Sequence, residues 1–343
     1  MTFDEQMMHR CLQLAVLGRG NVAPNPMVGA VIVHEGKIIG EGYHERFGEA
    51  HAEVNAVNSV KNPALLSEST IYVSLEPCAH FGKTPPCANL LVEKKFKRAV
   101  VGTLDAHAKV YKKGIQCLED AGIDLTLGVC EAECQELNEA FFTFYEKKRP
   151  FVLLKWAQTA NGLIDNSAGG NGEVNWISSP ETQVKVHQWR SEFQAILVGK
   201  NTILSDNPTL TVRSVEGVNP VRIVLDSRNE LPICSKIFNT EAETIIFNLE
   251  TEKQEKHVHF VQLATLEPRQ ILHKLYELDI QSVLIEGGRR VLQSFIDADL
   301  WDEARIITGK NEFESGTQAP TIKGEKFKDQ AIFGDHIAYL HPL

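Results

Sequence analysis

A histidine, a glutamate and two cysteines of this chain have the types and the spacing of a hydrolytic zinc site. His51-Ala52-Glu53 supplies an imidazole and, two positions later, a carboxylate, while Cys78 and Cys87 supply two thiols. One imidazole and two thiolates leave one position of a tetrahedral zinc ion open to water. The metal lowers the pKa of that water from 15.7 to roughly 7. We therefore expect one catalytic zinc ion on His51, Cys78 and Cys87, with Glu53 shuttling protons.

This order of residues is typical of zinc-dependent nucleobase deaminases, in which H-x-E precedes P-C-x-x-C and the glutamate is the general acid/base. The chain departs from the pattern because eight residues, not two, separate Cys78 from Cys87. Two other interpretations stay open. His80 could be a fourth ligand and close a structural zinc site. Alternatively the thiols are ordinary buried cysteines, which is how we interpret the remaining five: Cys11, Cys117, Cys130, Cys134 and Cys234.

Length and composition favour a cytoplasmic two-domain enzyme. The 343 residues suit two domains of about 100–200 residues each, and 43% hydrophobic with 23% charged residues is ordinary for a globular protein. The acidic start Met-Thr-Phe-Asp-Glu does not resemble a signal peptide, and no segment approaches the ~20 apolar residues of a membrane helix. Seven cysteines, two of them expected on metal, make a disulfide framework improbable. A net charge of -10 disfavours a nucleic-acid surface.

Strand and helix patterns alternate along the chain, which predicts an α/β fold. The charged segment Glu146-Lys-Lys-Arg-Pro150 divides it into residues 1–148 and 149–343. In the first part we expect strands over 27–34, 37–41, 70–75 and 98–104, and helices over 2–17, 50–59, 115–121 and 131–145, with another starting at Pro85-Pro86. In the second we expect strands over 151–158, 195–199, 221–226, 244–248, 257–263 and 282–285, and helices over 179–193, 267–278 and 289–298. Both halves of the metal site then lie at helix N-termini, whose dipoles favour thiolate and hydroxide.

A second chemical signal is Glu286-Gly287-Gly288, where a buried strand runs into two glycines and then a helix. Free backbone N–H groups at such a turn suit a phosphate group. A plain turn is the alternative, and the three-glycine dinucleotide fingerprint is absent.

With these residues in view, the chain resembles the bifunctional deaminase/reductase family of riboflavin biosynthesis over nearly its whole length. The first-half motifs are Pro24-Asn25-Pro26-Met27-Val28-Gly29, Gly42-Tyr43-His44, His51-Ala52-Glu53, Glu76-Pro77-Cys78-Ala79-His80 and Gly82-Lys83-Thr84-Pro85-Pro86-Cys87. The second-half motifs are Lys155-Trp-Ala157, Trp176-Ile-Ser-Ser-Pro180, Asn207-Pro208, Leu210-Thr-Val-Arg213, Pro220-Val-Arg222, Leu225-Asp226-Ser227 and Glu286-Gly287-Gly288. The Thr-Pro-Pro-Cys ending separates this family from tRNA adenosine and cytidine deaminases.

The resemblance implies a cytidine-deaminase-like three-layer domain followed by a dihydrofolate-reductase-like reductase domain. It implies zinc-dependent deamination of 2,5-diamino-6-ribosylamino-4(3H)-pyrimidinone 5′-phosphate. NADPH-dependent reduction of the ribosyl side chain would follow, giving 5-amino-6-(5-phosphoribitylamino)uracil. The expected partners are Zn²⁺, NADPH and a small phosphorylated pyrimidine, with neither nucleic acid nor membrane; a homo-oligomer is compatible with the sequence.

The resemblance also assigns contacts residue by residue. The deaminase pocket would be lined by Asn25, His44 and Lys83. NADPH would contact Ala157, Trp176, Thr202, Asp206, Ser227, Gly288, Arg289, Arg290, Val291, Leu292, Gln293 and Ser294. The reductase substrate would contact Arg190, Leu210, Arg213 and Glu286. Arginine can hold a phosphate bidentately, so we expect Arg190 and Arg213 on the substrate phosphate and Glu286 on a polar substrate group.

The chain departs from the family pattern in three places. Asn161 stands in Thr159-Ala160-Asn161-Gly162 where an aspartate is usual, Val174 replaces a serine, and Asp105-Ala106-His107-Ala108 replaces Asp-Pro-Asn-Pro. Two other classes of protein compete with this interpretation. A nucleic-acid editing deaminase should show a basic patch and an aromatic platform, which the acidic composition disfavours. A non-catalytic zinc-stabilised interaction protein would bind zinc without releasing ammonia.

Overall fold

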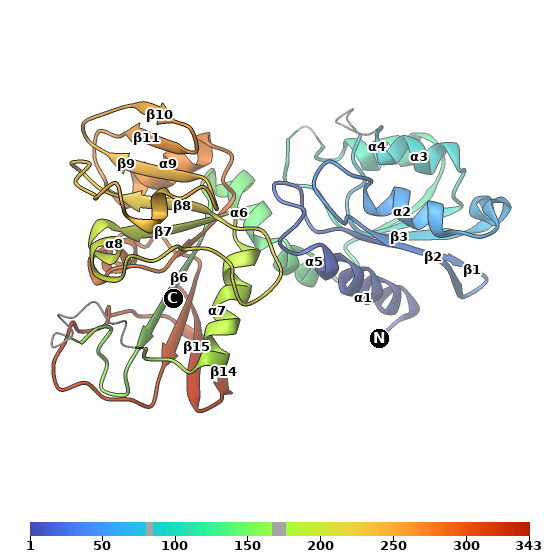
Figure 1. Ribbon diagram of the computed structural model, residues 1–343. Coiled ribbons are helices and arrows are strands. Elements are labelled where there is room, and N and C mark those ends of the chain that lie inside the picture. Colours follow the sequence, from blue (N-terminus) through green and yellow to red (C-terminus); the bar gives the residue numbers. More distant parts are fainter. Residues whose placement is uncertain (80–84, 109, 167–175) are drawn as a thin grey trace. The chain divides into compact units, whose positions relative to one another are not determined.

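The computed structural model describes residues 1–79, 85–108, 110–166 and 176–343. The chain forms two compact units, Met1–Lys147 and Lys148–Leu343 (Figure 1). The division lies one residue before the boundary expected from the charged segment that ends at Pro150. Among the described residues, no helix has the length and apolar character needed to cross a membrane.

The first unit is built on a five-stranded sheet with the order β2-β1-β3-β4-β5. β1 runs antiparallel to β2 and β3, whereas β3, β4 and β5 are parallel. The hairpin predicted at Glu35-Gly36 is present, and the φ angles of 47° and 74° at these two residues are those of a tight hairpin turn. The strands are β1 Gly29–His34, β2 Lys37–Tyr43, β3 Thr70–Leu75, β4 Arg98–Thr103 and β5 Asp124–Leu127.

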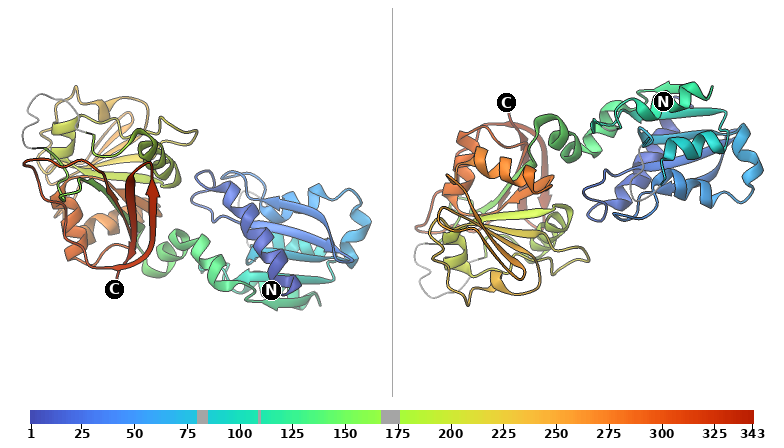
Figure 2. Two further views of the ribbon diagram at one scale, coloured as in Figure 1. Left: turned by 90° about the horizontal axis from the view of Figure 1, so that it is seen from below. Right: turned by 90° about the horizontal axis from the view of Figure 1, so that it is seen from above.

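Helices cover both faces of this sheet, as Figures 1 and 2 show. Successive strand residues point to opposite faces, so each face has its own apolar core. One core joins the sheet to α1 and α5 through Met8, Tyr72 and Cys134. The other joins it to α2, α3 and α4 through residues such as Ala56 and Leu118. The predicted three-layer α/β arrangement is thereby confirmed; its helices are α1 Phe3–Ala15, α2 Ala52–Ser59, α3 Cys87–Glu93, α4 Lys113–Asp120, α5 Glu131–Leu137 and α6 Glu139–Lys147.

The single helix expected over residues 131–145 is wrong, because Asn138 separates α5 from α6. The Asn138 side chain pairs with the backbone of Met27: its Oδ1 accepts the Met27 N–H at 2.7 Å and its Nδ2 donates to the Met27 carbonyl at 2.9 Å. This long-range pairing competes with helix continuation, a known property of asparagine side chains. It also holds the loop that carries Asn25.

The second unit is built on a ten-stranded sheet with the order β10-β11-β9-β8-β7-β12-β6-β13-β15-β14. The strands from β11 to β13 in this order are parallel, and β10, β15 and β14 are antiparallel to their neighbours. Its strands are β6 Phe151–Gln158, β7 Ala195–Gly199, β8 Val221–Leu225, β9 Thr244–Asn248, β10 Lys253–Glu255, β11 Val258–Gln262, β12 Ser282–Ile285, β13 Glu303–Thr308, β14 Glu325–Ile332 and β15 Asp335–His341.

The order of strands creates a switch point at the centre of this sheet. β7 follows β6 in the chain, but β12 is inserted between them. In open parallel sheets, ligands bind where the strand order reverses, beyond the carboxyl ends of the strands. The helices that flank this sheet are α7 Pro180–Glu192, α8 Lys200–Asp206, α9 Pro268–Glu277 and α10 Arg289–Asp297.

Sequence reasoning missed several short or terminal elements. The segment after Leu300 forms β13 beside β6 and then the β14–β15 hairpin, which extends the sheet by three strands. β14 is exposed over most of its length and β15 alternates in burial, so neither carries the Val and Ile runs that mark a buried parallel strand. The helix α8 is only seven residues long and β10 only three, too short for a periodic pattern.

Candidate active sites

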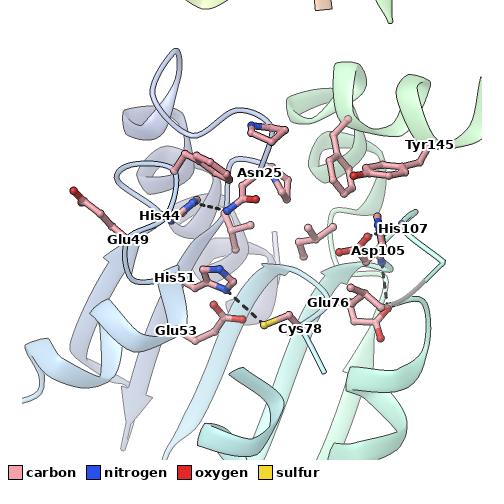
Figure 3. Close-up of a pocket in the computed structure, with 18 residues that line it drawn as sticks. Asn25, His44, Glu49, His51, Glu53, Glu76, Cys78, Asp105, His107 and Tyr145 are labelled. Carbon is pink, nitrogen blue, oxygen red and sulfur yellow. Dashed lines mark hydrogen bonds between the residues drawn. The ribbon is translucent and has the colours of Figure 1, made fainter. Parts of the chain in front are cut away.

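Three side chains that could hold a metal ion meet at the carboxyl edge of the first sheet. Figure 3 shows two of them, His51 and Cys78. The donor atoms of His51, Cys78 and Cys87 all lie within 4.8 Å of one another. The His51 Nδ1 atom lies 3.6 Å from Cys78 Sγ and 3.4 Å from Cys87 Sγ. Tetrahedral zinc with ordinary Zn–N and Zn–S bonds places such atoms about 3.5 Å apart. The donor set and its spacing therefore fit zinc.

Local sequence brings these donors to helix starts. His51 is the N-cap of α2, which begins two residues later than expected, and Cys87 is the first residue of α3. Cys78 follows β3, and its Sγ accepts the Cys87 backbone N–H at 3.3 Å. Hydrogen bonds from Cys87 and His51 lower the pKa of the Cys78 thiol to about 4. The hydrogen bond with Cys78, together with burial, raises the pKa of the Cys87 thiol, so the site favours the thiolate on Cys78. Metal binding requires the thiolate form of both cysteines.

Glu53 lies in the first turn of α2 beside the cluster, with 3% of its surface exposed. Burial, followed by the neighbouring Cys78, raises the pKa of Glu53 to about 7. A carboxyl group with a pKa near neutrality can both take up and release a proton at pH 7. The placement is the one expected of a proton shuttle.

The cluster opens into a cavity of about 320 Å³ that Asn25 and His44 also line (Figure 3). The His44 Nδ1 lies 3.0 Å from the Ala50 carbonyl, so it carries the proton. The other ring nitrogen is then an acceptor for the Asn25 amide, also at 3.0 Å. Burial lowers the pKa of His44, which keeps the ring neutral. Lys83, the third residue expected in the pocket, and His80, the possible fourth metal ligand, lie outside the described residues.

The opposite wall of the cavity was not assigned from sequence. It contains Asp105, His107 and Tyr145 (Figure 3). Asp105 Oδ1 accepts the His107 backbone N–H at 2.7 Å, and the rings of His107 and Tyr145 meet edge to face at 4.7 Å. Burial raises the pKa of Asp105 to about 7. One signal was available: Asp105 follows β4 as Cys78 follows β3, and neighbouring parallel strands end at the same edge.

The Glu76 side chain connects the loop that carries Cys78 to the wall of the cavity that contains Asp105. The buried carboxylate accepts four backbone N–H groups, from Asp105 at 3.2 Å, Lys112 at 3.0 Å, Gly114 at 3.0 Å and Ile115 at 3.3 Å. Four donors satisfy both oxygens of a carboxylate. The Glu-Pro-Cys motif therefore fixes where β3 meets the start of α4.

Gly114→Ala should disturb the deaminase cavity more than an ordinary glycine-to-alanine change. A Cβ at Gly114 would lie 1.9 Å from the Pro77 carbonyl oxygen, so the segment that Glu76 holds would have to move. We expect a loss of about 1–3 kcal/mol in the free energy of unfolding, measured by urea titration, as for overpacking. Glu119→Ala on the exposed face of the same helix, α4, is the control, since it adds no atom to a packed segment. Equal stability losses in the two variants would contradict this expectation.

The second candidate site is a cleft of about 940 Å³ at the switch point of the second sheet. Most of the residues expected there from sequence line it: Ala157, Trp176, Arg190, Thr202, Asp206, Arg213, Glu286, Gly288, Arg289, Arg290, Val291, Leu292 and Ser294. Ser227, Leu210 and Gln293 do not line it. The Leu210 side chain is buried in the core, and the Gln293 side chain binds Asp297 and the Thr321 backbone instead.

The Gly287-Gly288 turn forms a cradle that only glycine permits. Gly288 is the N-cap of α10 and has a φ of 75°, which side chains rarely adopt. A Cβ at Gly287 would lie 2.7 Å from Val198 and 2.9 Å from Thr202 Oγ1. The open N–H groups of α10 and the adjacent Arg289 and Arg290 suit an anionic ligand. These residues fit the phosphates of NADPH.

Arg190 and Glu286, both expected to contact the reductase substrate, line the cleft and are paired with each other. Arg190 donates from Nε and Nη2 to the two Glu286 oxygens, at 2.9 and 2.7 Å, and Lys155 Nζ lies 3.8 Å from the same carboxylate. Burial alone would raise the pKa of Glu286, but Arg190 and Lys155 outweigh it and lower the pKa to about 2. Glu286 thus has protein partners. The Nε and Nη2 atoms of Arg190 are therefore occupied by Glu286, and its role on the substrate phosphate stays a prediction.

Two further cleft residues were missed. Lys155 and His187 both line the cleft and are largely buried. Lys155 lies in the Lys155-Trp-Ala157 motif. His187 lies one helical turn before Arg190, so the two residues share a face of α7, and the expected position of Arg190 in the cleft could have indicated His187 as well. Both Lys155 and His187 are distant in the chain from Glu286, so sequence spacing alone does not place them in the same cleft.

The contacts of Asn161 explain why an asparagine stands where the family pattern has an aspartate. Its Oδ1 accepts the Thr159 hydroxyl at 2.6 Å, and its Nδ2 donates to the Phe313 carbonyl at 2.8 Å. An aspartate could not make the second bond, since an ionised carboxylate only accepts. Val174, the other departure in this unit, lies outside the described residues.

Arg213→Ala should weaken binding of a phosphorylated substrate to this cleft. Its Nη1 bonds the Thr209 hydroxyl, and no carboxylate within the described residues forms an ion pair with it. A charge-assisted contact contributes roughly 1.5–3 kcal/mol, so KM should rise about 10- to 100-fold. The dissociation constant for NADPH, measured by fluorescence titration, should stay unchanged. Arg269→Ala on the exposed face of α9 is the control; an unaltered KM for Arg213→Ala would contradict the assignment.

Comparisons with known proteins identify a deaminase family in the first part of the chain and a RibD reductase family in the second. The model of the cytidine and deoxycytidylate deaminase zinc-binding region matches residues 1–103, and that of the RibD C-terminal domain matches residues 150–310. The riboflavin biosynthesis protein RibD of Aquifex aeolicus is 43% identical over 329 residues, which cover 94% of this chain and 88% of the relative. The Escherichia coli RibD is 34% identical over 324 residues, which cover 88% and 86%.

A solved structure matches the whole chain. The crystal structure of a diaminohydroxyphosphoribosylaminopyrimidine deaminase/5-amino-6-(5-phosphoribosylamino)uracil reductase from Thermotoga maritima has a TM-score of 0.90 and 37% identity, covering 99% of each chain. The predicted fold class, a cytidine-deaminase-like domain followed by a reductase domain, is thereby confirmed. This chain belongs to the RibD family of riboflavin biosynthesis proteins, as its sequence motifs indicated.

Proposed function

We propose that this chain catalyses two successive steps of riboflavin biosynthesis, deamination in residues 1–148 and reduction in residues 149–343. The first substrate is 2,5-diamino-6-ribosylamino-4(3H)-pyrimidinone 5′-phosphate, which loses its 2-amino group as ammonia. The second step reduces the ribosyl side chain and gives 5-amino-6-(5-phosphoribitylamino)uracil. The observation that carries the proposal is the convergence of His51, Cys78 and Cys87 beside a buried Glu53.

In the deaminase site the residues divide the work between metal binding and proton transfer. Zinc bound by His51, Cys78 and Cys87 would supply a water activated at neutral pH. Glu53 takes the proton from that water and returns it to the leaving amino group. His44, whose two ring nitrogens bind Ala50 and Asn25, orients the Asn25 amide, which presents a fixed hydrogen-bonding group to the pyrimidine ring. Water thus replaces the amino group, and ammonia leaves.

In the reductase site the Gly287-Gly288 turn and the charged residues at the inner end of the cleft have separate tasks. When bound, NADPH would supply the hydride that reduces the ribosyl carbon, and a proton from solvent would complete the reduction. The Gly287-Gly288 turn and the start of α10 would hold the cofactor phosphates. Arg213 binds the substrate phosphate, and Glu286 holds Lys155 and Arg190 in place at the inner end of the cleft.

The proposal includes a cytoplasmic location, a small phosphorylated pyrimidine as substrate, and neither nucleic acid nor membrane as partner. Support comes from the acidic composition and from the absence, within the described residues, of a helix that could span a membrane.

Separate assays of the two half-reactions test this proposal. Zinc content is measured first, then ammonia release from the diaminopyrimidine phosphate, then NADPH oxidation with the deaminated product. We expect one zinc per chain and both activities. Zinc without ammonia release would favour a non-catalytic zinc-stabilised protein. Ammonia release without any NADPH oxidation would leave only the deaminase.

A further inference from the structure

The reductase cleft contains a histidine to which the chemistry above gives no role. His187 lies on α7 and lines the cleft with 7% of its surface exposed. Its Nδ1 accepts the backbone N–H of Arg213 at 3.3 Å. From the next turn of the same helix, Arg190 donates to the Thr211 carbonyl at 3.4 Å. The helix therefore holds the loop that carries Arg213 at two points.

That loop depends on such external contacts. It joins α8 to β8 and contains no helix or strand of its own. Leu210 within it has a φ of 55°, a conformation that is strained for a residue other than glycine. A strained backbone persists only where its surroundings over-determine it. The hydrogen bond from Arg213 to His187 is one of these constraints, and it lies immediately beside the arginine that faces the cleft.

The surroundings keep the imidazole in the form that can accept this bond. Burial, followed by the charges of Arg190 and Arg213, lowers the pKa of His187 to about 4, although Glu286 opposes this. A neutral ring has one unprotonated nitrogen, whereas an imidazolium has none. A neutral His187 also adds no charge to a cleft that already holds Lys155, Arg190 and Arg213.

We propose that His187 is a positioning residue that sets the affinity of the reductase site for the substrate phosphate by fixing the loop that carries Arg213. This inference rests on the proposed function, because it takes the reductase substrate to be a phosphorylated pyrimidine. Since His187 acts on binding and not on the reacting atoms, its loss changes KM and not kcat.

The test compares His187→Leu with His187→Asn in the full-length, zinc-loaded protein. An asparagine Oδ1 occupies the place of Nδ1 and can accept the Arg213 N–H, whereas leucine cannot. With the deaminated pyrimidine phosphate, His187→Leu should raise KM about tenfold and leave kcat within about twofold, and His187→Asn should restore most of the affinity. NADPH affinity, measured by fluorescence titration, should stay unchanged. His273→Leu on the exposed part of α9 is the matched control.

A double-mutant cycle makes the test specific. If His187 acts through Arg213, His187→Leu should cause no further rise in KM once Arg213 is alanine. An unchanged KM in His187→Leu, a fall in kcat alone, an equal loss in His187→Asn, or full additivity with Arg213→Ala would each overturn the proposal. A wild-type protein that does not oxidise NADPH with this substrate would count against the proposed function instead, so the two failures are distinguishable.

Discussion

Glu53→Gln should retain its zinc and lose ammonia release by a factor of about 10²–10⁴, which is the usual contribution of a positioned general acid/base. Glutamine has the size of glutamate but cannot take a proton from water, and Glu53 belongs to no group of metal donors in the described structure. NADPH oxidation should persist when the deaminated pyrimidine phosphate is supplied directly. Ammonia release and zinc content, measured on the same preparation, check this prediction.

Two further variants make the Glu53 result interpretable. Cys87→Ala removes a donor from the cluster and should lose both zinc and deamination, which separates metal loss from loss of the proton shuttle. Glu68→Gln changes an exposed carboxylate of the same unit and should leave both the zinc content and the rate of ammonia release unchanged. Near-normal ammonia release from Glu53→Gln would show that another group moves the proton.

Gly288→Val should abolish NADPH binding, with a loss of affinity on the order of a hundredfold or more. Valine is strained at a φ of 75°, and its side chain would project from the N-cap of α10 into the cradle beside Thr202. A phosphate approaching the free N–H groups of the helix would meet this side chain. Zinc content and ammonia release should stay at the wild-type level, since the first unit does not contain Gly288.

The control for Gly288 shares its backbone conformation. Gly122 also has a φ of 75°, but nothing lies within 4 Å of the place where a side chain would begin. Gly122→Val therefore introduces similar backbone strain in the other unit and should leave NADPH affinity intact. Fluorescence titration with NADPH compares the two variants. Unchanged affinity in Gly288→Val would exclude the glycine turn as the phosphate cradle.

The sequence by itself identified the zinc-binding residues and the glycine turn, because short motifs mark both. His51 and Glu53 are two positions apart, and a helix start follows each metal-binding segment, so local geometry almost suffices to place His51 beside Glu53. The fold brings His51 within reach of Cys78, 27 positions away. The apolar strands before Cys78 and before Glu286 could also be predicted from the sequence, since buried parallel strands are continuous runs of apolar residues.

The tertiary structure alone decided which groups meet across long distances in the chain. Arg190 and Glu286 are paired although 96 positions separate them. Asn138 ends a helix because Met27, 111 positions away, offers it a better partner than the next helical turn does. The role of His187 likewise became visible only through Arg213. Such pairings depend on how strands order themselves in a sheet, and short-range spacing carries no information about that order.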